Sequence, residues 1–502
     1  MKKIINTIEF KKKKTLINTI EFKKNKNFEG IIRIIRYSLS KFLFKFFKKS
    51  LSASNISKDE YALKIFDITR KGNSIRDNFK LSSKLKKEFP DNILIQLRYV
   101  WFSYLYGKIE FFEEIKSYWK QREKYISKNK LEDFDIGLID QSNMCGSLGN
   151  YFYVFTLIHS IKLNCVKFKQ IILIKDAKNK FTNDTLARYF KKHIKVVEGN
   201  YFSVASKLIE ILSIPIGFFC PHKDTATEIH LASNLVYQER INQKKLGCFE
   251  LEQEDLNKGR ELIKKFGIDE NQWFVCLHVR EASSKAEGSN EFYRNFQVQE
   301  YFKAIEYITE KGGYVFRVGD STMSNLPKMK NVIDYANHEE KCDFLDVYLG
   351  ARCKFTIATS SGFWTIPYYF NKPVLMTNSQ TCKDYYSLTE KDFFLPKFLK
   401  IGDSLKYATV EKYLKPPQGI FSVEVAKRSN DYKLKYKNCS SEDLYMATKE
   451  INENIDGKNI WSEDQIICKK EIENNNKMYK VNLKPYANIP KSYLSKLKAL
   501  NN

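Results

Sequence analysis

The sequence predicts an α/β protein with two Rossmann-like domains that face a cleft, preceded by an α-helical appendage. Short apolar runs alternate with helix-like segments from about residue 134, and the same alternation begins again at about residue 273. Alternation of this kind is typical of parallel sheets. Residues 55–130 differ, because they combine helical periodicity with few glycines and many aromatic side chains. The length of 502 residues agrees with two or three domains of ordinary size.

The first α/β unit is expected to contain three strands before residue 200. Apolar residues cluster at 134–139, 170–174 and 195–197, and each cluster is short enough to be a buried strand. A helix is expected at residues 151–162, between the first strand and the second. This order predicts a parallel arrangement, because a helical crossover joins the two strands.

The second unit is expected to repeat the pattern at greater length. Its first helix should span residues 297–311, because Gly312 and Gly313 end it. Further helices are expected at residues 343–351 and after Gly362. The predicted strands are 273–279, 314–318, 331–335, 355–359 and 373–377, the last of these being the final strand of the sheet.

These patterns divide the chain into five segments. The segment beyond residue 400 is rich in lysine and carries no readable motif. The predicted boundaries are 1–50 for a basic tail with an amphipathic helix, 51–132 for the helical segment, 133–265 and 266–400 for the two Rossmann-like domains, and 401–502 for an extension.

The first 50 residues stand apart from the rest. An octet at residues 5–12 recurs at residues 17–24, which indicates a duplication in a tail that tolerates insertions. In residues 31–49, cations and most large apolar residues fall on opposite sides of a helix. Such a helix could lie on an anionic membrane surface. It could equally be a core helix with a solvated basic face, and the sequence leaves both open.

Composition narrows the range of partners. The formal net charge of +26 would suit nucleic acid, but most of the cations are lysines in a chain with a strong compositional bias. Arginine, the better ligand for phosphates and bases, is the minority, so we predict no nucleic-acid partner. The ten cysteines form no Cys-x-x-Cys pair. We therefore expect no metal site and a reducing, cytoplasmic setting.

Polar residues that follow the predicted strands are the candidate ligand contacts, because parallel sheets bind ligands at the carboxyl ends of their strands. His278 and Arg280 end one strand and project to one face. Arg280 could hold a diphosphate or form a structural salt bridge. Asp320 follows the next strand, and its carboxylate could accept a hydrogen bond from a ribose hydroxyl or a base. The remaining candidates are Asp346 and the hydroxyl-rich turn of Thr359, Ser360, Ser361 and Gly362.

The turn allows two interpretations. Its hydroxyls and the N–H groups of a following helix could bind an anion. One serine could also act simply as a helix N-cap.

The order and spacing of four short motifs resemble a known family. The motifs are His278-Val279-Arg280-Glu281, Tyr293-Arg294-Asn295, Val318-Gly319-Asp320 and Ser361-Gly362 with Pro367. Over about 270–380 the chain resembles a group of bacterial glycosyltransferases of surface-polysaccharide pathways. More distantly, it is similar to the donor half of fucosyltransferases with a His-x-Arg motif, which have the two-domain GT-B fold.

The resemblance implies a nucleoside-diphosphate sugar as donor, a glycan or lipid-linked acceptor, and no cofactor or metal. It makes residues 133–265 the acceptor domain and residues 266–400 the donor domain. The protein would work in the cytoplasm, with the possibility of peripheral attachment to the inner face of the cell membrane.

By position, the resemblance also assigns roles to individual residues. Arg280 would hold the donor diphosphate, and Asp346 would help to bind the nucleotide. Ser360 or Ser361 would touch the phosphates, whereas Arg294 could add a second phosphate contact or only hold its loop.

The implied reaction is direct displacement at the anomeric carbon, in which a carboxylate takes the proton of the acceptor hydroxyl. Glu281 and Asp140 are the candidate bases, although each could be a surface or salt-bridged carboxylate. The fucosyltransferases usually have a second basic residue where this chain has Glu281, which leaves the donor sugar and base open. A loop that could face the acceptor, or could be a plain turn, contains Asn143, Gly146 and Gly149.

Two other functions stay open at the level of sequence. A nucleotide-sugar epimerase of the same fold would need acid and base carboxylates on both sides of the donor, and we cannot assign a second set. A non-catalytic, membrane-associated interaction protein would bind the nucleotide sugar without transferring it.

Overall fold

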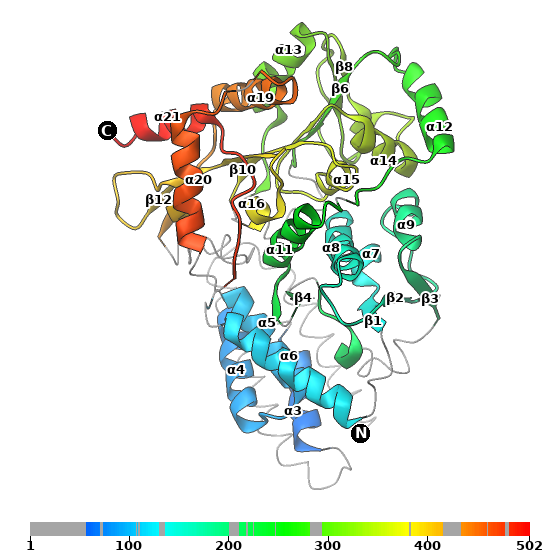
Figure 1. Cartoon of the computed structure of the whole chain (residues 1–502), viewed down its shortest axis with the longest axis vertical. Coiled ribbons are helices and arrows are strands. Elements are labelled where there is room, and N and C mark those ends of the chain that lie inside the picture. The colour runs from blue at the N-terminus through cyan, green and yellow to red at the C-terminus, as the bar shows by residue number, and fades with distance from the viewer. Residues whose placement is uncertain are drawn as a thin grey trace, which may run out of the picture. The chain divides into compact units, whose positions relative to one another are not determined.

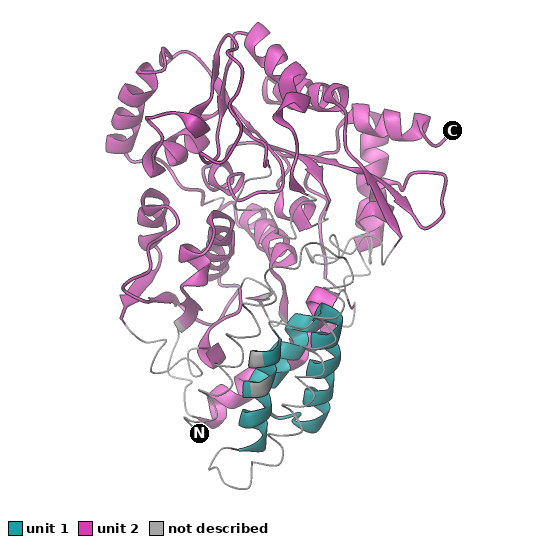
Figure 2. Ribbon diagram, turned by 180° about the vertical axis from the view of Figure 1, so that it is seen from behind, with its two compact units in different colours: residues 1–102 teal, residues 103–502 magenta. Residues whose placement is uncertain are grey.

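A computed structural model of the chain shows two compact units, residues 1–102 and 103–502 (Figure 2). The basic tail, its repeated octet and the amphipathic segment 31–49 lie outside the residues that the structure describes. The described residues are 57–70, 74–106, 108, 111–129, 136–199, 210–216, 219–223, 225–245, 247–281, 294–380, 383–414, 433–458, 460–476 and 481–502.

The predicted helical character of residues 55–130 is confirmed. The helices are α3 (Lys58–Thr69), α4 (Ile75–Glu88), α5 (Ile93–Tyr106) and α6 (Phe111–Lys128). Ser74 caps α4 by accepting a hydrogen bond from the Asp77 N–H. Within the first unit, the Arg98 guanidinium donates to Asp67 at 2.9 Å and so links α5 to α3.

In the second unit, helix α6 is followed by a three-stranded parallel sheet. Its strands are β1 (Ile136–Asp140), β2 (Gln170–Lys175) and β3 (Lys195–Glu198), in the order β1-β2-β3. Helix α8 (Tyr151–Lys162) joins β1 to β2 and has the bounds expected from the sequence, and α9 (Asp184–Lys191) joins β2 to β3. After β1 the chain first forms two short turns of helix, α7 (Ser142–Cys145) and η2 (Leu148–Asn150).

A hairpin and two helices connect the two sheets. Strands β4 (Phe219–His222) and β5 (Thr225–Glu228) pair antiparallel. They are followed by α11 (Ile229–Asn242) and α12 (Gln253–Lys264). Helix α11 contacts α8 on one side and α16 (Lys383–Ser387) on the other, as Figure 1 shows.

A six-stranded parallel sheet forms the larger part of the second unit. Its order is β11-β10-β9-β6-β7-β8, and every neighbouring pair is parallel. The strands are β6 (Phe274–His278), β7 (Tyr314–Arg317), β8 (Val332–Ile333), β9 (Thr356–Ala358), β10 (Val374–Ser379) and β11 (Phe393–Pro396). The helices and turns between them are η5 (Val298–Tyr301), α13 (Phe302–Glu310), η6 (Tyr335–Asn337), α14 (Asp343–Arg352) and α15 (Thr365–Tyr369).

The prediction that the strand at 373–377 ends the sheet is wrong. Strand β11 pairs in parallel beyond β10, and all four of its residues are buried. Full burial removes the alternation of apolar and polar residues that marks a half-exposed strand, and the run ends in Pro396. A further antiparallel pair follows, β12 (Phe398–Ile401) with β13 (Leu434–Lys437).

The described residues beyond residue 400 form helices that pack on the rest of the second unit. They include α17 (Val410–Tyr413), α19 (Ser441–Ile455), α20 (Glu463–Asn476) and α21 (Lys491–Ala499). Helix α19 contacts α13 and β10 and therefore covers the large sheet. Its start is fixed by a reciprocal capping box between Ser440 and Asp443. No helix among the described residues is both long and apolar enough to cross a membrane.

The two sheets share one aromatic core. The Phe152 ring of α8 lies 5.4 Å from Trp364, and the Phe155 ring lies 5.8 Å from Tyr368 and 4.9 Å from Tyr369. All five side chains are buried. Edge-to-face and tilted ring pairs of this kind add to the hydrophobic gain from burial. The packing of α8 on α15 therefore fixes one sheet against the other.

We expect Phe155→Ala to lower the free energy of unfolding of the second unit by about 3–5 kcal/mol, because it leaves a cavity where the sheets meet. Urea denaturation followed by tryptophan fluorescence measures this change. The control is Leu405→Ala, which removes an 88% exposed side chain and should change stability by less than about 0.5 kcal/mol. Equal effects of the two substitutions would show that the sheets do not depend on this contact.

Candidate ligand site at the switch point of the large sheet

The strand order creates a switch point at the carboxyl ends of β6 and β9. From β6 the chain proceeds outward through β7 to β8, and α14 then returns it to the other side of β6, where β9, β10 and β11 follow. The connections therefore leave β6 and β9 in opposite directions. Doubly wound sheets bind their ligands in the crevice at such a point. The candidates His278, Arg280 and Thr359–Gly362 all lie there.

Hydrogen bonds lock the ends of β6 and β9 together. The Thr359 N–H donates to the His278 carbonyl at 3.0 Å, and the Arg280 N–H donates to the Thr359 Oγ1 at 3.1 Å. The Ser361 hydroxyl is hydrogen-bonded to the His278 Nδ1 at 2.9 Å. The His278 ring also stacks on Phe363, with centroids 5.8 Å apart and an interplanar angle of 8°. The structure thus brings together four of the predicted positions.

His278 is neutral in this setting. Burial lowers its pKa to about 4, because the imidazolium would lose its hydration and would also face the charges of Arg317 and Arg280. A neutral imidazole carries one N–H and one lone pair. Its bond to Ser361 therefore fixes the direction of the serine hydroxyl without adding charge to the turn.

Two arginines flank the same turn. The Arg294 guanidinium donates to the Ser360 carbonyl at 3.2 Å. The Phe296 N–H donates to the Arg280 carbonyl at 2.8 Å, which holds the segment that carries Arg294 beside the end of β6. Residues from three separate sequence motifs therefore meet at the turn that follows β9.

Neither serine of the turn caps a helix. Helix α15 begins only at Thr365, and its N-cap position is Trp364, which makes no side-chain cap. A helix does follow Gly362 as expected, but Phe363 and Trp364 form a turn between Gly362 and its first residue. The hydroxyls of Ser360 and Ser361 are not used as helix caps, and Ser361 bonds His278 instead.

The loop after β1 reaches this turn from the smaller sheet. A Cβ atom on Gly362 would lie 2.8 Å from the Gly149 nitrogen, so the two backbones touch. The predicted loop is internally bonded: the Asn143 amide donates to the Asp140 carbonyl at 3.0 Å, and Gly146 packs against the Ser142 carbonyl. The Asp140 Oδ1 accepts from the Ser142 N–H and hydroxyl. Asp140 ends β1 and starts this loop, and Gly149 near its other end contacts the turn at the switch point.

Three other predicted carboxylates have partners inside the fold. Glu281 accepts from the buried Arg317 at 2.7 Å. Asp320 accepts from the N–H and hydroxyl of Thr322, and although burial alone would raise its pKa, these bonds lower it. Asp346 is paired with Lys341 at 2.9 Å, while burial raises its pKa.

Sequence reasoning missed a buried carboxylate near the site. Glu228 is 1% exposed and accepts from the His230 and Leu231 N–H groups at 2.7 and 3.2 Å. Burial raises its pKa. The charges of Glu228 and Arg294 both act on the Tyr153 hydroxyl at the start of α8. The sequence did hold a signal for this carboxylate, because Glu228 stands where a short strand meets a helix and two residues before His230.

The described residues contain no cluster of three or more histidine, cysteine, aspartate or glutamate side chains that could hold a metal ion. The nine cysteines described are all free thiols.

No protein-family model matches the sequence, and no curated protein matches it either. Among solved structures, the chain is similar to a glycosyl transferase of family 9 from Veillonella parvula, with 11% identity and a TM-score of 0.37, over 63% of this chain and 96% of that one. It is also similar to the iron-containing dodecameric glycosyltransferase TibC from enterotoxigenic E. coli, with 10% identity and a TM-score of 0.32, over 64% and 76% of the two chains. Both similarities are remote.

The contact between Gly362 and Gly149 gives a matched pair of substitutions. Gly362→Ala places a Cβ 2.8 Å from a backbone atom, so the loops must separate, and we expect a loss of about 1–3 kcal/mol. The Cβ of Gly149→Ala would meet Gly362 at 3.4 Å, an ordinary contact, and should change stability by less than about 1 kcal/mol. Thermal unfolding of both variants measures the difference. A Gly362→Ala protein as stable as Gly149→Ala would contradict the described approach.

Stability should fall as the pH decreases from about 6.5 to about 4. In this range the unfolded chain protonates His278 near its ordinary pKa of about 6.5, whereas the folded protein takes up that proton only near pH 4. His222, with a pKa of about 4 in the fold, contributes in the same direction. Melting temperatures measured across this range should decline less steeply for His278→Gln than for the wild type. Identical slopes would mean that His278 is not buried as a neutral ring.

Proposed function

We propose that this protein is a glycosyltransferase that moves a sugar from a nucleoside-diphosphate donor to a glycan or lipid-linked acceptor. One observation carries the proposal. At the switch point, the hydroxyl-rich turn of β9 lies between Arg280 and Arg294 and is touched by the loop that follows β1 of the other sheet. A donor held by the turn would thus meet an acceptor approaching from that loop, which is the division of labour of a GT-B-type enzyme.

The donor diphosphate would bind to the arginines and the turn. A guanidinium presents paired N–H donors that match two phosphate oxygens, and the Ser360 and Ser361 hydroxyls supply further donors. Positive charge at this place would stabilise the nucleoside diphosphate as it leaves, a role that a divalent cation takes in other transferases. On this basis we propose transfer without a metal.

The acceptor hydroxyl must lose its proton as its oxygen attacks the anomeric carbon. The bond from that carbon to the diphosphate oxygen breaks, and the electron pair leaves with the nucleotide. Asp140 is the better-placed base: in the described residues only its Oδ1 accepts hydrogen bonds, both from Ser142, and its loop lies against Gly362. Glu281 is already engaged, because its carboxylate forms an ion pair with the buried Arg317 at 2.7 Å.

Two finer features complete the proposal. We place the activity in surface-polysaccharide synthesis, with a hexosyl or fucosyl group transferred, on the strength of the motif resemblance. Attachment to a membrane through residues 31–49 belongs to the same proposal, since that segment lies outside the described residues.

The proposal predicts that the purified chain binds one class of nucleotide. Isothermal titration with GDP, UDP, CMP and dTDP sugars should give one tight ligand. Arg280→Ala should weaken its binding about 10–100-fold, the loss expected when a charged hydrogen-bond donor is removed.

The control for this test is Arg260→Ala. Arg260 lies on α12, pairs with Glu270 and is partly exposed, so its loss should leave the affinity unchanged. A folded wild-type protein that binds none of the four nucleotide classes would sink the proposed function.

A further inference from the structure

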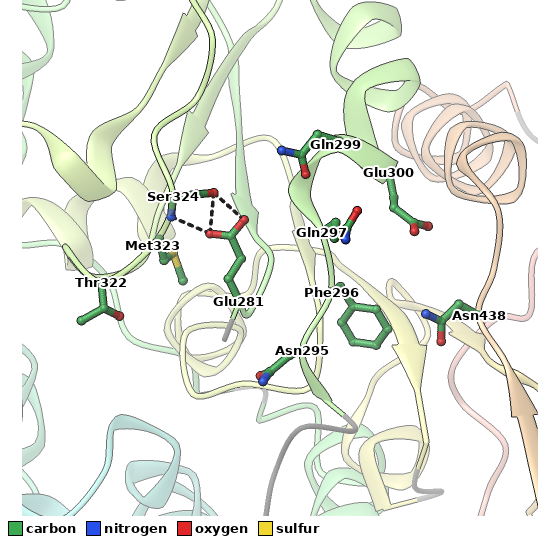
Figure 3. Close-up of a pocket in the computed structure, with 10 residues that line it drawn as sticks. All are labelled: Glu281, Asn295, Phe296, Gln297, Gln299, Glu300, Thr322, Met323, Ser324 and Asn438. Atoms are coloured by element: carbon green, nitrogen blue, oxygen red, sulfur yellow. Dashed lines mark hydrogen bonds between the residues drawn. The ribbon is translucent and has the colours of Figure 1, made fainter. Parts of the chain in front are cut away.

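A groove opens beside the switch point, at the ends of β6 and β7 (Figure 3). Its volume is about 790 Å³, which is enough for one or two sugar rings at the usual size of ligand sites. It is lined by Glu281, Asn295, Phe296, Gln297, Gln299, Glu300, Thr322, Met323, Ser324 and Asn438. The candidate-site residues from sequence include only the first of these ten.

The lining has a composition suited to hydroxyl groups. Four of the ten side chains are carboxamides, two are carboxylates and two are hydroxyls, and no lysine, arginine or histidine is among them. Carboxamides donate and accept hydrogen bonds, and carboxylates accept them, so together they match hydroxyls that do both. A phosphate or a sugar acid would instead meet the like charges of Glu281 and Glu300.

Glu281 is fixed as a charged acceptor at one side of the groove. Its Oε2 accepts from the Arg317 guanidinium at 2.7 Å and from the Ser324 N–H at 2.8 Å, as well as from the Ser324 hydroxyl at 3.0 Å. Its Oε1 accepts only from that hydroxyl, at 2.8 Å, within the described part of the chain. Because a carboxylate oxygen has two lone pairs, Oε1 keeps room for a hydroxyl of a ligand.

An aromatic ring and several exposed amides form the rest of the wall. Figure 3 shows the Phe296 ring between Asn295, Gln297 and Asn438. The Lys397 ammonium lies 4.9 Å from the centre of that ring and backs it. Gln297, Gln299 and Asn438 are exposed, and no hydrogen bond to their side chains occurs within the described residues. Phe296 is only 8% exposed, so a small part of its ring borders the groove as an apolar contact, while the unengaged amides beside it offer donors to the hydroxyls of a sugar.

The groove lies next to the hydroxyl-rich turn of residues 359–362. Glu281 follows Arg280 in the chain, and Phe296 donates its N–H to the Arg280 carbonyl at 2.8 Å. A molecule in the groove therefore lies next to a group held by Arg280. The two places differ in charge, since Arg280 and Arg294 adjoin the turn and two carboxylates line the groove.

We infer that this groove binds an uncharged sugar ring through Glu281, Gln297 and Asn438, with Phe296 as its apolar wall. The inference builds on the proposed function and deepens it by naming the substrate class of one subsite. The sugar comes either from the donor itself or from the acceptor glycan, and the chemistry of recognition is the same for both.

The test uses the full chain with Gln297→Ala and Asn438→Ala, and with Gln253→Ala as a matched control. Gln253 is an exposed amide on α12 that bonds only Asn257 within the described residues. All three changes remove an exposed carboxamide, so none should affect folding, which thermal unfolding verifies.

The first arm probes an acceptor. The proteins are applied to a printed array of neutral, uronic-acid, sulfated and phosphorylated glycans. Binding of neutral glycans by the wild type and the control, reduced at least tenfold in the two groove variants, would support the inference and assign the groove to the acceptor.

The second arm probes the donor. Titrations compare each nucleotide sugar with its free nucleoside diphosphate. If the groove holds the donor sugar, the variants lose at least tenfold in affinity for the nucleotide sugar but bind the free diphosphate like the wild type.

The inference is overturned if neither arm distinguishes the groove variants from Gln253→Ala, or if only anionic glycans bind. Failure of the proposed function looks different. In that case no nucleotide binds to the wild type, while the glycan arm still decides the fate of the groove.

Discussion

A layer of aromatic rings joins the two sheets. It lies between helix α8, which follows the first strand of the smaller sheet, and the turn and helix α15 that follow β9 in the larger sheet. Phe152 and Phe155 from one side pack on Trp364, Tyr368 and Tyr369 from the other. Everything described at the switch point depends on this layer, because each of these elements directly borders a loop of the site. The rings are buried and closely packed, so neither loop can shift without opening a cavity.

A second contact strengthens the same junction. The Asp343 carboxylate at the start of α14 accepts from the Asp184 N–H at the start of α9 at 2.9 Å, and the Asp343 carbonyl accepts from Asn183. The negative side chain thus satisfies a free N–H at a helix N-terminus that belongs to the other sheet. With the aromatic layer, this bond sets the distance at which Gly149 and Gly362 touch. The close approach of the two loops therefore results from packing between residues that lie outside the loops themselves.

The electrostatics of the site follow from which charges the fold neutralises. Glu281 is paired with Arg317, and Asp346 with Lys341, while Asp320 is satisfied by Thr322. The buried His278 stays neutral because its hydration is lost. Positive charge at the turn thus comes from Arg280 and Arg294, whereas two carboxylates line the adjoining groove. One edge of a sheet thereby offers two neighbouring surfaces, one suited to an anion and the other to an uncharged polyol.

The sequence by itself determined the local elements and the strand-end motifs. Residues 151–162 have the apolar pattern of a helix, and residues 170–174 form a short apolar run typical of a strand. The ends of α8 and β2 could therefore be predicted to within one residue. His278, Arg280 and Ser361 could be named as candidates because the ends of parallel strands must lie at one edge. Strand β11 was missed, since a fully buried strand shows no alternation, and Glu228 was missed because its burial comes from elements distant in the chain.

Only the tertiary structure decided which candidates meet and how they are charged. Three contacts join residues that are far apart in the sequence. The hydrogen bond between Ser361 and His278 spans 83 positions, and the one between Glu281 and Arg317 spans 36. The backbone contact of Gly149 with Gly362 spans 213. No local pattern encodes such pairs, because they follow from strand order and from the packing of α8 on α15. The groove likewise exists only after four separate segments of the chain are brought together: Glu281, residues 295–300, residues 322–324 and Asn438.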